Sequence, residues 1–282
     1  MAAPDSSLPV AVFDSGVGGL TVLHECLVSL PHEDFLYLGD TARFPYGDRA
    51  SAQLAEFARE LSGILLDRGA KLLVVACNSA TAAALPALRD ELERVVPVVA
   101  VVGPESRLAA RATANGKVGL IATPATVNSG AYAAALAQAA PQAELHAVAS
   151  AELAPLIQEG GDVDHRTLTC VEGACRPLKQ ARVDTVILGC THYPLVRPVL
   201  QRELGRQVTI VSSGEAIADD VERRLADRDA ENDTNRRGSY RFICTGDESE
   251  FRSLAARSLQ LPVERVERVA VEAPAAAGVG AA

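Results

Sequence analysis

The chain of 282 residues is poor in basic side chains. Its 27 lysines and arginines are outnumbered by 36 aspartates and glutamates, which gives a formal net charge of −9. Non-specific binding of nucleic acid needs a basic surface, so this balance argues against a nucleic-acid partner. It also argues against long-range steering of an acidic substrate, so an anionic ligand would have to be held by local donors.

Lysine is especially scarce, and this bears on cofactor use. The chain has only Lys71, Lys117 and Lys179. A pyridoxal phosphate enzyme needs a lysine in its pocket to form a Schiff base. Lys71 and Lys117 open apolar runs, which predicts that they lie at strand ends away from a cleft, and Lys179 falls in a helical stretch. We therefore expect chemistry without a cofactor.

Long hydrophobic runs are absent as well. No stretch approaches the roughly 20 apolar residues that span a bilayer, and Met1 to Leu8 lacks the basic and apolar parts of a secretory signal. We expect no membrane partner and a cytoplasmic location. The six cysteines are then expected to be free thiols rather than disulfides. Cys170 and Cys175 lie close together, but no further His or Cys completes a zinc set, so no metal is expected.

Short apolar runs alternate regularly with longer amphipathic stretches. This alternation predicts parallel sheets with helices on both faces. The expected helices are one that begins near Leu20, Gln53–Arg68, Thr81–Arg94, Ser129–Ala139, Leu168–Gln180 and Ala216–Asp227. The expected strands are Pro9–Phe13, Asp34–Leu38, Leu72–Ala76, Val98–Val101, Val118–Ile121, Glu144–Val148, Thr185–Leu188, Thr209–Val211 and Tyr240–Cys244.

The domain organisation follows from two breaks in this pattern, at Gly103-Pro104 and at Ser212–Gly214. We interpret both as crossovers between two halves. The predicted fold is therefore an α/β fold of two similar doubly wound parallel-sheet domains, with the active site between them. Residues 9–102 and 214–272 would form the first domain and 103–213 the second, and residues 273–282 would be a flexible tail.

Two cysteines occupy equivalent places in two similar segments. Cys77 ends the apolar run in Lys71-LLVVACNSA, and Cys190 ends the run in Asp184-TVILGCTHYP. In open α/β sheets, side chains just past the carboxyl ends of strands line the ligand crevice. Two facing halves would therefore place one thiol on each side of a shared cleft. A pair of opposed proton carriers is what inversion of a C–H stereocentre requires.

Polar residues follow both thiols. Asn78 and Ser79 follow the first, and Thr191 and His192 follow the second. These donors, with a helix N-terminus, would lower the pKa of a thiol. His192 suits an acid–base or orienting role because imidazole titrates near neutral pH. The alternatives are a structural histidine that ties down a loop and, for each cysteine, a small core residue.

Two further loops follow expected strands. In Asp14-Ser-Gly-Val-Gly-Gly-Leu, the glycines could bring N–H groups to an anion at a helix N-terminus; a plain turn capped by Asp14 is the alternative. In Gly39-Asp-Thr-Ala-Arg-Phe-Pro-Tyr-Gly47, Tyr46 could cover a ligand and the Gly47 N–H could approach it. A surface turn is the alternative there.

Together these segments resemble the glutamate racemases, the cofactor-independent enzymes of peptidoglycan precursor supply. The motifs FDSGVGGLTVL, YLGDTARFPYG, VVACNSATA, TPATVNSGAY and ILGCTHYPLV occur in this order, and the resemblance runs from about Val10 to Cys244. It implies interconversion of L- and D-glutamate by a two-base mechanism, with glutamate as the small-molecule partner, and we expect a homodimer.

The resemblance also implies roles for individual residues. Cys77 and Cys190 would be the two proton donor/acceptors, assisted by Asp14 and His192 respectively. The residues expected to hold the substrate are Asp14, Ser15, Tyr46, Gly47, Asn78, Ser79, Thr123, Thr126, Thr191 and His192.

Two positions depart from the family pattern. Ser79 stands where threonine is usual and keeps the hydroxyl. Gln158 stands where glutamate is usual, and an amide cannot take up a proton as a carboxylate can; the neighbouring Glu159 is a candidate to replace it. Three other functions remain open: a racemase acting on aspartate or another α-substituted acid, a non-enzymatic two-lobed amino-acid binding protein, and a cysteine hydrolase. The last two leave one or both thiols unexplained.

Overall fold

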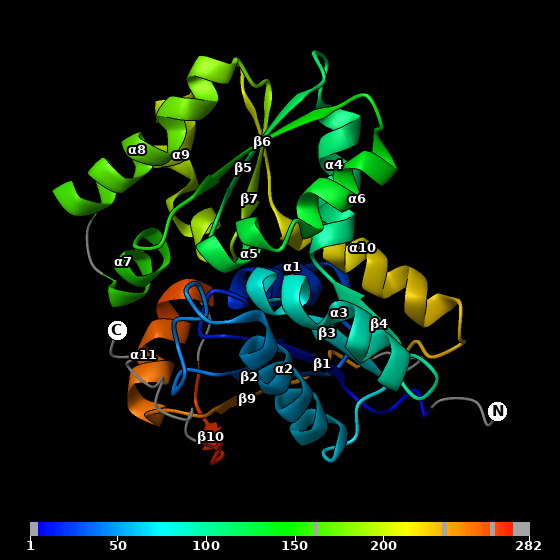
Figure 1. Cartoon of the computed structure of the whole chain (residues 1–282). Helices are drawn as coiled ribbons and strands as arrows, with labels where there is room; N and C mark the ends of the chain where they lie inside the picture. Colours follow the sequence, from blue (N-terminus) through cyan, green and yellow to red (C-terminus); the bar gives the residue numbers. More distant parts are fainter. Residues whose placement is uncertain (1–4, 161–162, 233–235, 260–262, 273–282) are drawn as a thin grey trace, which may run out of the picture.

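Two parallel sheets flanked by helices make up the protein (Figure 1). The computed structural model describes residues 5–160, 163–232, 236–259 and 263–272. The predicted α/β fold with two parallel sheets is confirmed. Within the described ranges, no helix is both long and apolar enough to cross a membrane.

The larger sheet has the strand order β10-β9-β2-β1-β3-β4, and all of its pairs are parallel. β1, β2 and β3 are buried along their whole length, as expected of parallel strands covered on both faces. β1 is central, so the residues after it open into the middle of the sheet's carboxyl edge. The strands are β1 Val10–Asp14, β2 Phe35–Gly39, β3 Leu72–Val75, β4 Val98–Ala100, β9 Tyr240–Cys244 and β10 Val266–Arg268.

The smaller sheet has the order β6-β5-β7-β8, again all parallel. β5 and β7 form its buried centre, whereas the edge strand β6 is half-exposed. Figure 1 draws this sheet above the larger one. The strands are β5 Lys117–Ala122, β6 Glu144–Ala149, β7 Thr185–Gly189 and β8 Thr209–Val211.

Helices connect the strands and carry the chain between the sheets. α4 follows β4, the edge strand of the larger sheet, and leads to β5 of the smaller sheet. α10 follows β8 and packs against α1 (Figure 1). One buried apolar cluster contains side chains of both sheets, for example Val12 and Leu120. The helices are α1 Leu20–Ser29, α2 Ser51–Leu66, α3 Asn78–Leu92, α4 Val102–Ala112, α5 Pro124–Asn128, α6 Ala131–Ala139, α7 Leu153–Glu159, α8 His165–Ala181, the 3₁₀ turn η1 Tyr193–Val196, α9 Arg197–Leu204, α10 Ser213–Ala226 and α11 Glu248–Leu259.

The predicted strands are confirmed to within one residue at each end, but several helices were missed or misplaced. Gly103-Pro104 lies in the first turn of α4, where a proline is tolerated because its N–H would have no helical partner. The helix predicted over Ser129–Ala139 is confirmed as α6, but it begins two residues later, because Gly130 at φ 70° separates α5 from α6. The predicted tail lies outside the described residues, and the domain boundaries stay a prediction.

Candidate active site

Cys77 and Cys190 lie at the carboxyl ends of strands in opposite sheets, and both line one small cavity. Cys77 caps α3, and its Sγ accepts the Ala80 N–H at 3.4 Å. Cys190 directly follows β7, and its Sγ lies 3.9 Å from Nδ1 of His192. Both thiols are buried. All six cysteines are free, as the sequence predicted.

The cavity between the thiols is lined by most of the residues singled out from the sequence. Its volume is about 20 Å³, which is room for about one water molecule. The structure therefore represents a closed form. The lining residues are Ser15, Phe44, Pro45, Tyr46, Gly47, Cys77, Asn78, Ser79, Thr123, Ala151, Ala154, Pro155, Cys190, Thr191 and His192.

Asp14 and Thr126, two of the predicted site residues, lie one layer behind the cavity wall. Asp14 is fully buried at the end of β1, where one carboxylate oxygen accepts the Gly16 N–H at 3.0 Å and the other accepts the Thr191 hydroxyl at 3.2 Å. The second bond joins residues from the two sheets. Asp14 thus places a negative charge close to the cavity and holds Thr191 against it.

Three hydroxyls meet on the other side of the cavity. Oγ of Ser79 lies 2.9 Å from Oγ1 of Thr123 and 3.1 Å from Oγ1 of Thr126, and the two threonine oxygens are 3.0 Å apart. Thr123 caps α5 and Ser79 lies in the first turn of α3, so the cluster joins two helix N-termini. Hydroxyls at the positive ends of two helices form a suitable environment for a carboxylate.

Buried charged side chains, which were not singled out from the sequence, hold the loop that carries Tyr46. The Tyr46 hydroxyl donates to Asp40, so it is not free to bind a ligand, and burial raises its pKa well above the ordinary value. Arg43 is buried, donates to Asp40 at 2.6 Å and stacks 4.0 Å above the Phe57 ring. The GDTAR segment before Phe44 could have predicted this ion pair, since Asp and Arg three residues apart can pair within a turn.

His192 is contacted by Gln158, not by the alternative Glu159. Nε2 of His192 lies 2.9 Å from Oε1 of Gln158, and the same oxygen accepts the Val17 N–H at 3.5 Å. Glu159 is exposed, with its carboxylate 3.7 Å from Arg166. Both residues lie in α7, which is not among the helices expected from the sequence, and the helix turns the two neighbours in different directions.

Gly16 and Gly18, in the turn after β1, make room for Gln158 and His192. A Cβ on Gly16 would collide with the amide of Gln158, and a Cβ on Gly18 would collide with the ring of His192. The turn between β1 and α1 therefore lies directly against side chains that follow strands of the other sheet. Close approach of side chains, rather than a cradle for an anion, explains why glycine is needed here.

The thiol pKa values move in the opposite direction to the sequence expectation. Burial raises the pKa of Cys77 to about 12, and the Asp14 charge adds to this, while donors from Ala80 and Ser15 lower it by less. Burial also raises the pKa of Cys190, against a lowering by the His192 backbone N–H. Desolvation of a thiolate outweighs the helix terminus here, so both groups are neutral thiols in the closed form.

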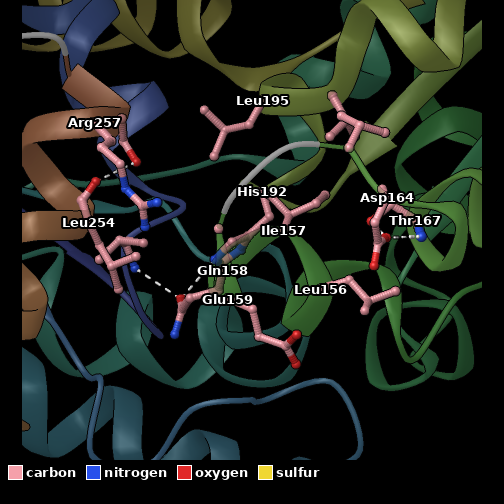
Figure 2. A pocket seen from close by; sticks show the side chains of 15 residues that line it. Leu156, Ile157, Gln158, Glu159, Asp164, Thr167, His192, Leu195, Leu254 and Arg257 are labelled. Atoms are coloured by element: carbon pink, nitrogen blue, oxygen red, sulfur yellow. Dashed lines mark hydrogen bonds between the residues drawn. The ribbon is translucent and has the colours of Figure 1, made fainter.

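A second cavity of about 250 Å³ adjoins the first and shares His192 with it. Figure 2 shows Gln158 beside His192, with Arg257 and Leu254 of α11 on one side and Asp164 and Thr167 on the other. Burial lowers the pKa of His192, so its ring is neutral between the two cavities. Among the described residues, no group of acidic, His and Cys side chains could hold a metal ion.

Comparison with known proteins agrees with this geometry. Residues 29–221 match the model of the Asp/Glu/hydantoin racemase family. A glutamate racemase of Beutenbergia cavernae is 45% identical over 271 residues, covering 93% of this chain and 92% of the relative. One from Listeria monocytogenes serotype 4a is 41% identical over 260 residues, covering 92% and 97%.

Solved structures extend the likeness to three dimensions. A glutamate racemase isoform from Bacillus anthracis superposes with a TM-score of 0.88 at 37% identity, covering 95% of this chain and 98% of that one. The Escherichia coli glutamate racemase, solved with L-glutamate and the activator UDP-MurNAc-Ala, has a TM-score of 0.76 at 33% identity, covering 94% and 100%. The chain therefore belongs to the Asp/Glu/hydantoin racemase family and, within it, to the glutamate racemases, a group of isomerases.

Proposed function

We propose that the protein interconverts L- and D-glutamate without a cofactor, by moving the α-proton between two thiols. One of Cys77 and Cys190 removes the proton as a thiolate, and the other delivers a proton to the opposite face. The observation that carries this proposal is that both thiols line one cavity from opposite sheets. A single swinging base would not need the second thiol.

The groups around the cavity are suited to stabilising the charges of a bound amino acid. The Asp14 carboxylate and the Asn78 carbonyl oxygen would attract the substrate ammonium. The hydroxyls of Ser79 and Thr123, with Thr126 behind them, would hold one carboxylate. Ser15, Thr191, His192 and the backbone near Tyr46 and Gly47 would bind the remainder. Donors placed in advance around developing negative charge usually supply the largest electrostatic contribution to such a step.

The substrate would also activate the thiols. In the closed form both thiols have raised pKa values because their thiolates would be desolvated. A substrate ammonium in the cavity adds a positive charge within a few ångströms, and an opposite charge nearby favours the ionised form of a thiol. A proton released from one thiol to solvent water before the cleft closes would then leave a thiolate beside the α-carbon.

The wider role follows from the same relatives. We infer that the D-glutamate serves peptidoglycan precursor synthesis, which is supported by the muramyl nucleotide that activates the Escherichia coli enzyme. We also propose that the protein works in the cytoplasm as a homodimer. The free state of all six cysteines supports the reducing compartment.

The test is optical. Purified protein without added cofactor is incubated with L- or D-glutamate, and circular dichroism is followed to equilibrium, with L- and D-aspartate in parallel. Loss of the signal from both glutamate isomers is expected. No change with glutamate, or racemisation of aspartate in its place, would overturn the proposal.

A further inference from the structure

Glu105 is a fully buried carboxylic acid that the proposed reaction does not use directly. It lies in the first turn of α4, directly after the chain leaves β4 and crosses toward the other sheet. α4 packs against α6 and α10 there. A buried carboxyl at a crossover is expensive unless its oxygens are used, so its partners indicate what it does.

Two of the hydrogen-bonded partners of Glu105 come from different parts of the fold. Oε2 of Glu105 accepts the hydroxyl of Tyr132 on α6 and accepts Nδ2 of Asn78 at 3.2 Å. Nδ2 of Asn78 also donates to the Tyr132 hydroxyl at 2.6 Å. The Asn78 amide nitrogen is thereby directed into a buried triangle of three side chains, and its other two members, Tyr132 and Glu105, do not line the cavity.

The remaining polar atom of Asn78 is left for the cavity. Oδ1 of Asn78 is buried and has no hydrogen-bond partner among the described residues, while Asn78 itself lines the space between the thiols. A buried acceptor without a partner destabilises the protein, because it has lost its hydrogen bonds to water. A ligand that brings an N–H donor to this atom recovers that loss.

We propose that Glu105 is a positioning residue which, with Tyr132, fixes the Asn78 amide so that its carbonyl oxygen accepts a hydrogen bond from the substrate ammonium. The inference rests on the proposed racemase function and adds a residue outside the motifs that follow the strands. Without the acceptor on Glu105, the amide could rotate and present a donor to the ammonium instead, which would repel it.

The protonation of Glu105 fits this role. Burial raises its pKa to about 8, although bonds from Tyr132, Ser213 and Asn78 lower it. The acid is therefore neutral near pH 7, and Oε2 accepts in either state. A neutral Glu105 also adds no negative charge to that of Asp14 near the thiols, whereas an ionised Glu105 would raise the pKa of Cys190 further. The titratable groups whose pKa an ionised Glu105 raises are Tyr132 of α6 and Cys190.

Kinetics of five variants test the proposal. Glu105→Leu removes the acceptor, and the KM for glutamate should rise about tenfold or more, with kcat changing by less than about threefold. Glu105→Gln keeps an acceptor oxygen and should restore most of the loss. Asn78→Ala should match Glu105→Leu, and the double variant should lose no more than either alone. Ser106→Ala, a buried neighbour that bonds only within α4, is the control and should keep its KM.

Solvent exchange of the Asn78 side-chain amide, followed by nitrogen-edited NMR, tests the geometry without any turnover. The amide hydrogen that points at Glu105 and Tyr132 should be protected in the wild type and in Glu105→Gln, and should exchange rapidly in Glu105→Leu. If the leucine variant fails to fold, Tyr132→Phe should weaken this protection. Additive losses for Glu105→Leu and Asn78→Ala, or an amide that exchanges freely in the wild type, would overturn the proposal. A wild type that fails to racemise glutamate would instead refute the proposed function, and the exchange data would still decide the geometry.

Discussion

Replacing Gln158 with glutamate should change the charge of His192. In the wild type, Oε1 of Gln158 accepts both Nε2–H of His192 at 2.9 Å and the Val17 N–H. This leaves Nδ1 without a hydrogen, 3.9 Å from the Cys190 sulfur. Because burial also lowers its pKa, the ring is a neutral acceptor for the Cys190 thiol.

The size of the change follows from this separation. A carboxylate at the position of the amide puts two unit charges about 4 Å apart, which is worth about 4 kcal/mol at an effective dielectric constant near 20. That corresponds to a rise of about 3 units in the pKa of His192, less the cost of burying the new carboxylate. The imidazolium would carry a hydrogen on Nδ1, and this charge would lower the pKa of Cys190.

The assay is nitrogen-15 NMR of the histidine rings between pH 5 and pH 9. The wild-type ring of His192 should stay neutral with its hydrogen on Nε2, and the Gln158→Glu ring should be charged at pH 7. The matched control is Glu159→Gln, which changes an exposed neighbour and should leave the ring unaffected. Since the two enantiomers of glutamate have equal free energies, any change in kcat/KM must be the same in both directions.

Two outcomes would refute the reasoning. A wild-type ring with its hydrogen on Nδ1 would mean that the sulfur of Cys190 faces a donor already. A Gln158→Glu ring that stays neutral at pH 7 would mean that the added carboxylate is itself protonated or lies elsewhere.

Three further predictions concern the thiols and Glu105. Cys77→Ser and Cys190→Ser should each nearly abolish racemisation of both isomers, because a hydroxyl is too weak an acid and base to replace a thiol; a single variant that keeps most of its kcat/KM would contradict two bases. In deuterium oxide, product formed early should carry deuterium at the α-carbon while the remaining substrate stays largely unlabelled, as measured by mass spectrometry after chiral separation, and substantial unlabelled product would rule out two separate thiols. The pKa of Glu105 is raised from 4.5 to about 8, so its stabilising contribution is complete below pH 4.5 and is lost as the pH rises toward 8. Over this range the free energy of unfolding, measured with denaturant, should fall by up to about 5 kcal/mol more in the wild type than in Glu105→Gln. The same pH dependence in both proteins would contradict the burial of an acid.

The strands and the two thiols could be predicted from the sequence because both depend on short, local patterns. Uninterrupted apolar runs such as Leu72–Val75 occur in strands that are covered on both faces, and the polar residue that ends such a run lies at the sheet edge. β10 was missed because Val266–Arg268 is short and charged, and it is a strand only through its pairing with β9.

The rest of the site could not be predicted because it depends on contacts between distant segments. Gln158 meets His192 only when α7 packs against η1, the turn that follows β7, 34 residues further along the chain. Glu105 reaches Asn78 only through the crossover of α4. The thiol pKa was predicted in the wrong direction because the sequence shows the helix terminus but not the burial that outweighs it.

The closed cavity should protect the two thiols from oxidation and alkylation. With a pKa of about 12, roughly one Cys77 in 10⁴–10⁵ is ionised near neutral pH. Peroxides and alkylating agents attack thiolates and need access to them. The unloaded protein therefore keeps two reactive residues in an inert, shielded state, and a covalent inhibitor would need either a cationic group that mimics the substrate or the moment when the cleft stands open.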